Sequence, residues 1–321
     1  MRGPLLRRAA GLAFGLCAID GLSAFAVTPD SASTPRTEGM AAVCDSLAAD
    51  PDDPRRRPGS AGIPFDKIDA GRAIIACGAA LAADPSDVQL QYQLGRAYLA
   101  KREFAVAIDA LRKADERGYP VAAFELGRLY LGGIGVAKNA KEGATYVWKA
   151  GEGGVVPAIQ MMAILYYLGE GISENKAEAR IWFNRAAEAG DASAMNTLGM
   201  MLRDGEGGPQ EPKAARALFR KAAEAGEVSA MDNYGAMLAN GQGGRAEPRQ
   251  ARSWFQKAAE AGDFGGMVHL GQFMAAGLGG PRDVKGARAW LEKAAASGKD
   301  YAVKALAAFE ETQAKRPAKK K

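Results

Sequence analysis

Histidine is almost absent from this sequence: among its 321 residues there is only one, His269. Cysteine occurs three times, at positions 17, 44 and 77, far along the chain from that histidine. A structural zinc site normally takes four ligands, mostly Cys or His, and acid–base or nucleophilic catalysis needs a second reactive group beside the first. The sequence therefore predicts no metal, no cofactor and no catalytic residue.

A net excess of positive charge is also missing from most of the chain, although the formal net charge is +5. The excess lies at the two ends, in the segment MRGPLLRR and in the tail KRPAKKK at 315–321. The residues between the ends carry a slight negative excess, so the broad basic surface that nucleic-acid binding requires is missing. We expect no nucleic-acid partner, and we expect the basic tail to be solvated and disordered.

The N-terminal segment has few acids and a short apolar run. Three arginines precede AAGLAFGLCAIDGLSAFA, which ends in an A-x-A-type cleavage site. This pattern is typical of a secretory signal peptide, so we expect removal of residues 1–26 by cleavage after Ala26, with 27–37 as a linker. The apolar run is interrupted by Asp20 and is short for a span of about 20 residues. A membrane anchor and a lipid-modified Cys17 are the alternatives. The predicted location is the periplasm or the exterior, with no integral membrane span after processing.

One stretch of sequence recurs three times at intervals of 36 residues: AAEAGDASAMNTLGMML at 186–202, AAEAGEVSAMDNYGAML at 222–238 and AAEAGDFGGMVHLGQFM at 258–274. Glycines with the same spacing extend this register over residues 122–301 without insertion or deletion. Similarity at a fixed period is the signature of repeat proteins, in which neighbouring units bury each other's apolar faces. The predicted units are 122–157, 158–193, 194–229, 230–265 and 266–301.

Each unit contains two helical patterns. In SAMNTLGMMLRDG (193–205) apolar side chains recur at spacings of three and four residues, and KAARALFRKAAEAG (213–226) has a second apolar face. The connection GEGGPQEP contains glycines that suit a left-handed helix stop and prolines that suit a helix start. Glycine also recurs inside the first helix, where it costs about 1 kcal/mol relative to alanine. Its recurrence predicts a close approach of the partner helix.

The segments AMNTLGMMLRDGEG and ARALFRKAAEAG resemble the Sel1-like repeat, a relative of the tetratricopeptide repeat with a longer, glycine-rich connection. The resemblance covers residues 122–301, and the shorter unit at 88–121 resembles a plain tetratricopeptide repeat. It implies an all-α fold, a right-handed superhelix (solenoid) of helical hairpins. We expect residues 302–314 to form a C-terminal capping helix.

Cleavage of the signal peptide would leave two cysteines, Cys44 and Cys77, in an exported chain. Two such cysteines most simply form a disulfide; the alternative is two free buried thiols. The bond would close a proline-rich loop within residues 38–87, which we interpret as an N-terminal capping segment. A covalent link is physically reasonable there, because the terminal unit of a solenoid lacks a neighbour on one side.

Sel1-like proteins commonly act as adaptors in assembly and signalling, and several bacterial ones work in the envelope. The resemblance therefore implies a non-catalytic protein–protein interaction scaffold of the cell envelope, whose partner is another envelope protein. A periplasmic regulator of a membrane sensor kinase is an alternative. A β-lactam-binding or hydrolytic enzyme is another, but the matching motif, S-x-x-K at Ser173–Lys176, lies in a repeat connection and is interpreted as a turn. The sequence leaves the oligomeric state open.

Positions that vary from unit to unit point to a binding surface. Packing between hairpins keeps a position constant, whereas a position free of packing can diverge towards a ligand. In tetratricopeptide-like solenoids the matching positions of the first helices line the concave wall, which implies that a partner peptide or helix binds in this groove. Aromatic and arginine side chains, which dominate interfaces, are concentrated in the N-terminal units, so we expect docking there. The predicted groove residues are Tyr92, Arg96, Phe124, Arg128, Gln160, Tyr167, Asn196 and Arg203.

Overall fold

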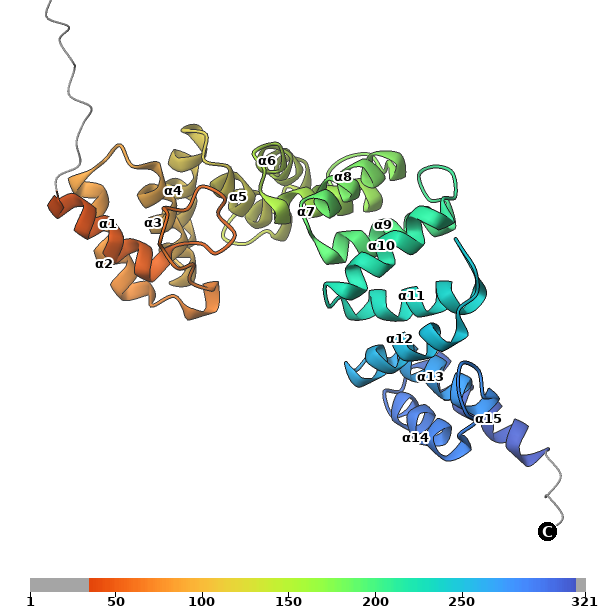
Figure 1. The fold of residues 1–321 in the computed structure, drawn as a ribbon. Helices are drawn as coiled ribbons and strands as arrows, with labels where there is room; N and C mark the ends of the chain where they lie inside the picture. The colour runs from red at the N-terminus through yellow and green to blue at the C-terminus, as the bar shows by residue number, and fades with distance from the viewer. Residues whose placement is uncertain (1–34, 316–321) are drawn as a thin grey trace, which may run out of the picture.

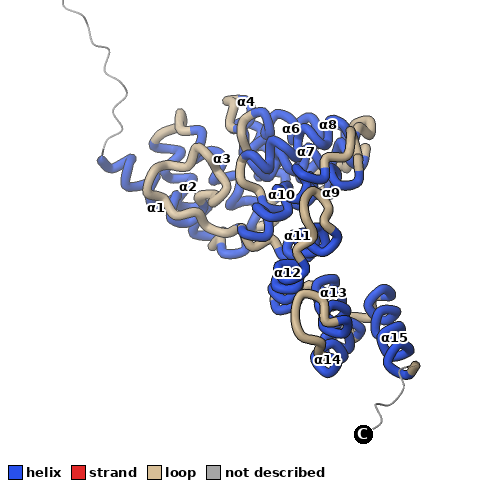
Figure 2. The backbone as a smooth tube through the Cα atoms, turned by 45° about the vertical axis from the view of Figure 1, so that its right-hand side comes forward, coloured by secondary structure: helices blue, strands red, loops and turns tan. Residues whose placement is uncertain are grey.

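The computed structural model describes residues 35–315, and throughout this range the regular secondary structure is helical (Figures 1 and 2). Helices pack as consecutive hairpins, so the predicted all-α repeat fold is confirmed. In Figure 1 the stack runs from α1 at one end to α15 at the other and bends in between. The predicted signal peptide and residues 316–321 of the tail lie outside the described residues. No helix within 35–315 has the length and apolar character needed to cross a bilayer.

The helices follow one another as α1 (Pro35–Ala48), η1 (Phe65–Lys67, a 3-10 turn), α2 (Ala70–Ala83), α3 (Val88–Ala100), α4 (Phe104–Glu116), α5 (Pro120–Gly132), α6 (Ala140–Glu152), α7 (Val156–Leu168), α8 (Lys176–Glu188), α9 (Ala192–Asp204), α10 (Pro212–Glu224), α11 (Val228–Asn240), α12 (Pro248–Glu260), α13 (Phe264–Ala276), α14 (Val284–Ala295) and α15 (Asp300–Ala314).

The glycine-rich connection of each hairpin has two roles. Gly205 and Gly207 have φ values of 77° and 71°, in the left-handed region predicted for a helix stop. A Cβ on Gly207 would also lie 2.2 Å from the carbonyl oxygen of Lys176, at the start of the preceding second helix. Beside it, the guanidinium of Arg180 donates to the carbonyl oxygen of Pro209 at 3.0 Å. The connection therefore both ends a helix and packs against the hairpin before it.

The first helices carry a glycine that faces the second helix of the same hairpin, except α7, which has Ala163 there, and this confirms the predicted close approach. A Cβ on Gly199 would lie 2.8 Å from the ring of Phe219, and one on Gly235 would lie 2.7 Å from the ring of Phe255. Both rings are buried, with exposed fractions of 0% and 1%. The missing side chain lets each ring rest on the helix backbone, so the hairpin core is dense although its helices are rich in alanine.

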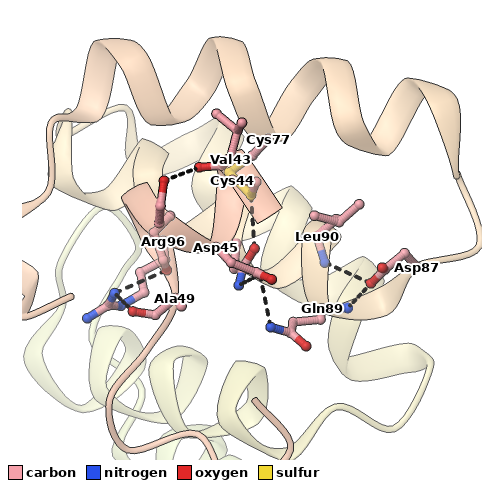
Figure 3. Close-up of a disulfide and its surroundings, with 12 residues drawn as sticks. Val43, Cys44, Asp45, Ala49, Cys77, Asp87, Gln89, Leu90 and Arg96 are labelled. Carbon is pink, nitrogen blue, oxygen red and sulfur yellow. Dashed lines mark hydrogen bonds between the residues drawn. A yellow bond between two sulfur atoms is a disulfide. The ribbon is translucent and has the colours of Figure 1, made fainter. Parts of the chain in front are cut away.

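The N-terminal end is built from α1, α2 and the segment that joins them. The predicted disulfide between Cys44 and Cys77 links α1 to α2 within a small apolar cluster that also contains Leu90 of α3 (Figure 3). Both cysteines are fully buried. The disulfide therefore fixes the two capping helices to each other on the face that meets the first regular hairpin.

Substitution of Gly235 by alanine should destabilise the protein, whereas the same substitution at Gly78 in α2 should stabilise it. A Cβ at Gly78 meets no atom within 4 Å, so alanine gains about 1 kcal/mol of helix propensity there. At Gly235 the Cβ would collide with Phe255, and overpacking of about 1–3 kcal/mol outweighs that gain. Urea unfolding followed by circular dichroism measures both effects. Equal changes in the two variants would contradict the packing role of the repeated glycine.

Opening of the disulfide should weaken the cap. The cysteines are separated by 33 positions, and closing a loop of this size stabilises a protein by about 3–4 kcal/mol. We expect Cys77→Ser to lower the melting temperature, and intact mass of periplasm-purified protein to show no free thiol without reductant. Detection of two free thiols in that protein would contradict the bond.

Candidate binding groove

The inner face of the solenoid is the side on which the first helices of successive hairpins meet. Helix α11 contacts α13, and α13 contacts α15. Asn233 Nδ2 donates to Asn196 Oδ1 at 2.9 Å, and His269 Nδ1 lies 2.7 Å from Asp232 Oδ1. In a curved stack, the row of helices whose members lie closest together is on the concave side. The first helices α5, α7, α9, α11 and α13 therefore line the inner face.

Two predicted groove residues on α3, Tyr92 and Arg96, are not accessible to a partner. Their exposed fractions are 0% and 3%. They are covered by the chain between α1 and α2, of which we call residues 49–66 the cap segment. The expectation that these two side chains face an open groove is thus corrected: they hold the protein's own chain. This covering could not be inferred from the repeat pattern, because the cap segment is not part of a repeat.

The cap segment is held much as a bound peptide would be. The Arg96 guanidinium donates to the carbonyl oxygens of Ala49 at 3.0 Å and Ile63 at 2.7 Å (Figure 3 shows Arg96 beside Ala49). The Tyr92 hydroxyl donates to Asp50, whose carboxylate also lies 3.5 Å from Arg96 Nε. Burial raises the pKa of Tyr92 well above its ordinary value, which keeps the hydroxyl protonated as a donor.

The cap segment also reaches the beginning of α5. The Tyr119 hydroxyl donates to the carboxylate of Asp53, and Arg55 donates to the carbonyl oxygen of Gly118 at 2.9 Å. Burial raises the pKa of Asp53, although the hydrogen bond from Tyr119 opposes the rise. The inner face is therefore closed from α3 to the start of α5.

Beyond the cap segment the inner face is open. The Arg128 side chain on α5 is 53% exposed, lies 5.9 Å from the ring centroid of Phe124 and pairs with Glu125 at 3.2 Å. On α7, Ile164 and Leu168 lie one helical turn apart with exposed fractions of 41% and 62%. Neither of these apolar residues is among the groove residues predicted from the sequence. They continue the stripe begun by Phe124 and Arg128 onto the next first helix.

The remaining predicted residues are less free. Gln160 on α7 is half-buried. Tyr167 donates its hydroxyl to Glu206 at 2.7 Å. Arg203 pairs with the neighbouring Asp204 at 2.8 Å. Asn196 accepts its hydrogen bond from the next first helix and is only 7% exposed. Variation at these positions therefore reflects contacts within the protein as well as exposure.

A cavity of about 490 Å³ opens where the cap segment meets α5. Phe65 of the cap segment and Ile134 in the connection after α5 are 48% and 46% exposed. A sequence signal for Ile134 existed, because the next three units place Glu170, Glu206 and Gln242 at its position between two glycines. The lining residues are Phe65, Leu99, Arg102, Phe104, Glu125, Arg128, Leu129 and Ile134.

The charge of this cavity is positive. Arg102 and Arg128 contribute two guanidinium groups, and Glu125 is its one acidic lining residue. Burial raises the pKa of Glu125, although the charge of Arg128 opposes the rise. The arrangement can attract an anionic group next to an apolar one.

The rest of the inner face offers little to a catalyst or a metal. Within residues 35–315 no group of three or more His, Cys, Asp and Glu side chains could hold a metal ion. The lysine of the S-x-x-K motif, Lys176, directs its ammonium to Glu206 at 3.4 Å and to the ring of Tyr167 at 4.9 Å. This motif therefore belongs to the contact between two repeats. Farther along the face, Ala236 and Ala275 present only small side chains.

His269 should make stability depend on pH. Burial lowers the pKa of His269, but the hydrogen bond and charge of Asp232, with Asp263 adding to them, raise it above its ordinary value overall. The stabilisation is fully present below about pH 6.5 and is lost as the pH rises through the raised pKa. Because the side chain is 40% exposed, we expect less than about 1 kcal/mol.

Urea unfolding at pH 5.5 and pH 8.5 measures this effect in the protein and in His269→Gln. The variant should lose more unfolding free energy at pH 5.5 than at pH 8.5. Asp263 and Tyr301, which also face this pair, remain in both proteins, so their titration cancels in the comparison. The same loss at both pH values would contradict the predicted charge on His269.

Comparison with solved structures supports the architecture. The structure of a protective antigen present in uropathogenic Escherichia coli strains, which displays an SLR fold, is similar with a TM-score of 0.68 and 28% identity. The match covers 75% of this chain and 52% of that one, so this chain spans about half its length. A Sel1 repeat protein from Oxalobacter formigenes is similar with a TM-score of 0.62 and 31% identity, over 65% of this chain and 86% of that one.

No curated protein sequence gives a significant match. The model of the Sel1 repeat matches five segments that together make up more than half of the chain. Four of them begin two residues before a predicted unit, and the last begins where its unit does. The segments are 120–155, 156–191, 192–227, 228–263 and 266–299. The chain therefore belongs to the Sel1 repeat family.

Proposed function

We propose that the protein is a non-catalytic scaffold of the cell envelope that binds an extended peptide or a helix of another envelope protein on its inner face. The observation that carries the proposal is the open stripe on α5 and α7, where Arg128, Ile164 and Leu168 are exposed on adjacent first helices. A solenoid presents such side chains as one continuous surface. Contiguous exposed apolar side chains mark interaction sites, and arginine is enriched among interface hot spots.

The cap segment supports this reading, because it occupies the same face just ahead of the open stripe. It binds through an arginine that takes backbone carbonyls and through tyrosines that take carboxylates. The arginine takes groups that every peptide carries, whereas the tyrosines take the side chains of Asp50 and Asp53. The inner face of this protein thus already holds one non-helical segment, partly by its backbone.

The assignment to the envelope rests on the predicted signal peptide and on the Cys44–Cys77 disulfide. Disulfides persist in oxidising compartments such as the periplasm. The similar chain from uropathogenic Escherichia coli is described as a protective antigen, which agrees with an extracytoplasmic location for a protein of this architecture.

The double variant Phe124→Ala/Arg128→Ala should weaken capture of the partner more than tenfold. The two side chains lie together on the open stripe, and truncation at an interface hot spot costs about 2 kcal/mol or more. The measurement is affinity capture from envelope extracts with the tagged protein, with the dominant captured protein quantified. Helicity and melting temperature should remain nearly unchanged, because the Arg128 side chain is mostly exposed and Phe124 is only partly buried.

The control is Ala236→Ser/Gln272→Ser, which changes the two residues on α11 and α13 that occupy the repeat position of Arg128. It should leave capture unaltered. Equal loss in the two double variants, or loss in neither, would place the binding site outside the N-terminal half of the inner face.

A further inference from the structure

The cavity between the cap segment and α5 combines apolar walls with two arginines. Phe65, Phe104 and Ile134 contribute apolar surface, and Arg102 and Arg128 contribute guanidinium groups. Arg128 is paired with Glu125, whereas the Arg102 guanidinium has no hydrogen-bonding or ionic partner among the described residues. The lining residues therefore include two positive charges and one negative charge, and the charge of Arg102 is left without a counter-charge.

The backbone at Arg102 is unusual. Its φ of 63° makes it the one non-glycine residue with a positive φ in the range 35–315. A side chain with a Cβ is disfavoured in this conformation, and glycine is the residue that adopts it readily. Arg102 thus has a strained backbone and an unpaired charge at the edge of an apolar cavity. Such a combination is typical of a residue that serves a ligand rather than the fold.

The cavity lies at the closed end of the open inner face. The cap segment covers α3, and the burial of Tyr92 and Arg96 beneath it shows that no free path continues along that helix. A peptide that lies on α7 and α5 and runs towards the cap segment therefore reaches the cavity where the free surface of the first helices stops. The end of a chain is either an ammonium or a carboxylate, and two arginines favour the carboxylate.

We propose that this cavity binds the C-terminal residue of the partner chain. The bulky apolar side chain of that residue packs against Phe65, Phe104 and Ile134, and its terminal carboxylate is attracted by Arg102 and Arg128. One residue can fill both roles, because its side chain and its terminal carboxylate are attached to the same Cα. The proposal rests on the proposed function, since the partner is the same peptide on the same face.

Two of the other repeats have an acidic residue at the position of Ile134. Glu170 pairs with Lys138 at 3.1 Å, and Glu206 pairs with Lys176 at 3.4 Å, so these two connections carry ion pairs between repeats. Ile134 forms an exposed apolar edge instead, as Leu278 does in the last repeat, but only Ile134 lies beside the cap segment and its cavity. An acidic side chain here would repel a carboxylate, and the exchange of Ile134 for glutamate is therefore a natural test.

The experiment uses the full protein purified from the periplasm of expressing cells and two N-acetylated pentapeptides, Gly-Ser-Ala-Ala-Phe with a free carboxylate and the same peptide as an amide. Isothermal titration at low salt should show saturable binding of the free acid and at least tenfold weaker binding of the amide. A third peptide that ends in alanine should also bind at least tenfold more weakly, because it leaves the apolar walls uncovered.

Variants separate the ligand role from the structural one. Arg102→Gly fits the left-handed backbone, so its melting temperature should be unchanged or higher, while binding of the free acid should fall at least fivefold. Ile134→Glu should reduce binding of the free acid at least tenfold. The control Arg220→Ala removes an exposed arginine on α10 that is paired only with Glu224 at 3.9 Å, and it should leave binding unchanged.

The proposal is overturned if the acid and the amide bind equally, if the acid shows no saturable binding up to about 1 mM, or if Arg102→Gly binds as the unchanged protein does. These outcomes differ from failure of the proposed function. A partner whose capture depends on Phe124 and Arg128 but which tolerates amidation of its C-terminus would leave the scaffold intact and remove only the terminal-residue site.

Discussion

The contact between a small residue of the first helix, a glycine in all repeats except at Ala163, and a buried side chain of the second helix sets the geometry on which the whole molecule depends. Phe219 and Phe255 can lie directly against the backbone of the first helix because Gly199 and Gly235 have no side chain. Hairpins of equal thickness can stack with a constant offset. That constant offset brings the first helices together in one row, and the row forms a continuous inner face.

The two ends of such a stack need a cap, because the terminal hairpin has no neighbour to bury the surface that other hairpins bury against each other. At the N-terminus the cap segment covers this surface of α3 through hydrogen bonds and an ion pair, where another hairpin would cover it through apolar packing. A buried ion pair such as Asp50 with Arg96 pays for its desolvation only when further hydrogen bonds complete it, and the carbonyls of Ala49 and Ile63 supply them. The same solution closes the inner face, so the first usable surface for a partner begins at α5.

The hairpins, the glycine-rich helix stops and the close helix approach could be predicted from the sequence. They recur at the same positions in five units of 36 residues, because each unit packs in the same way. The disulfide was predicted from the single pair of cysteines that would remain in a chain with a predicted signal peptide. The burial of Tyr92 and Arg96 did not follow, because it depends on contacts such as that of Arg96 with Ile63, which join a repeat to a segment of unique sequence. The cavity was missed for the same reason, since Phe65 forms one of its walls.

Variation between repeats has two physical causes on this inner face, and the structure separates them. Asn196 and Asp232 vary, but each is bonded to the residue 37 positions later on the next first helix, Asn233 and His269. In these two pairs the polar side chains of neighbouring repeats satisfy each other's hydrogen bonds. Ile164 and Leu168 vary without a polar partner and remain exposed. The C-terminal hairpins thus use their inner side chains to bind each other, whereas Arg128 of α5 and Ile164 and Leu168 of α7 remain exposed. Binding is therefore expected where the repeats do not complete one another.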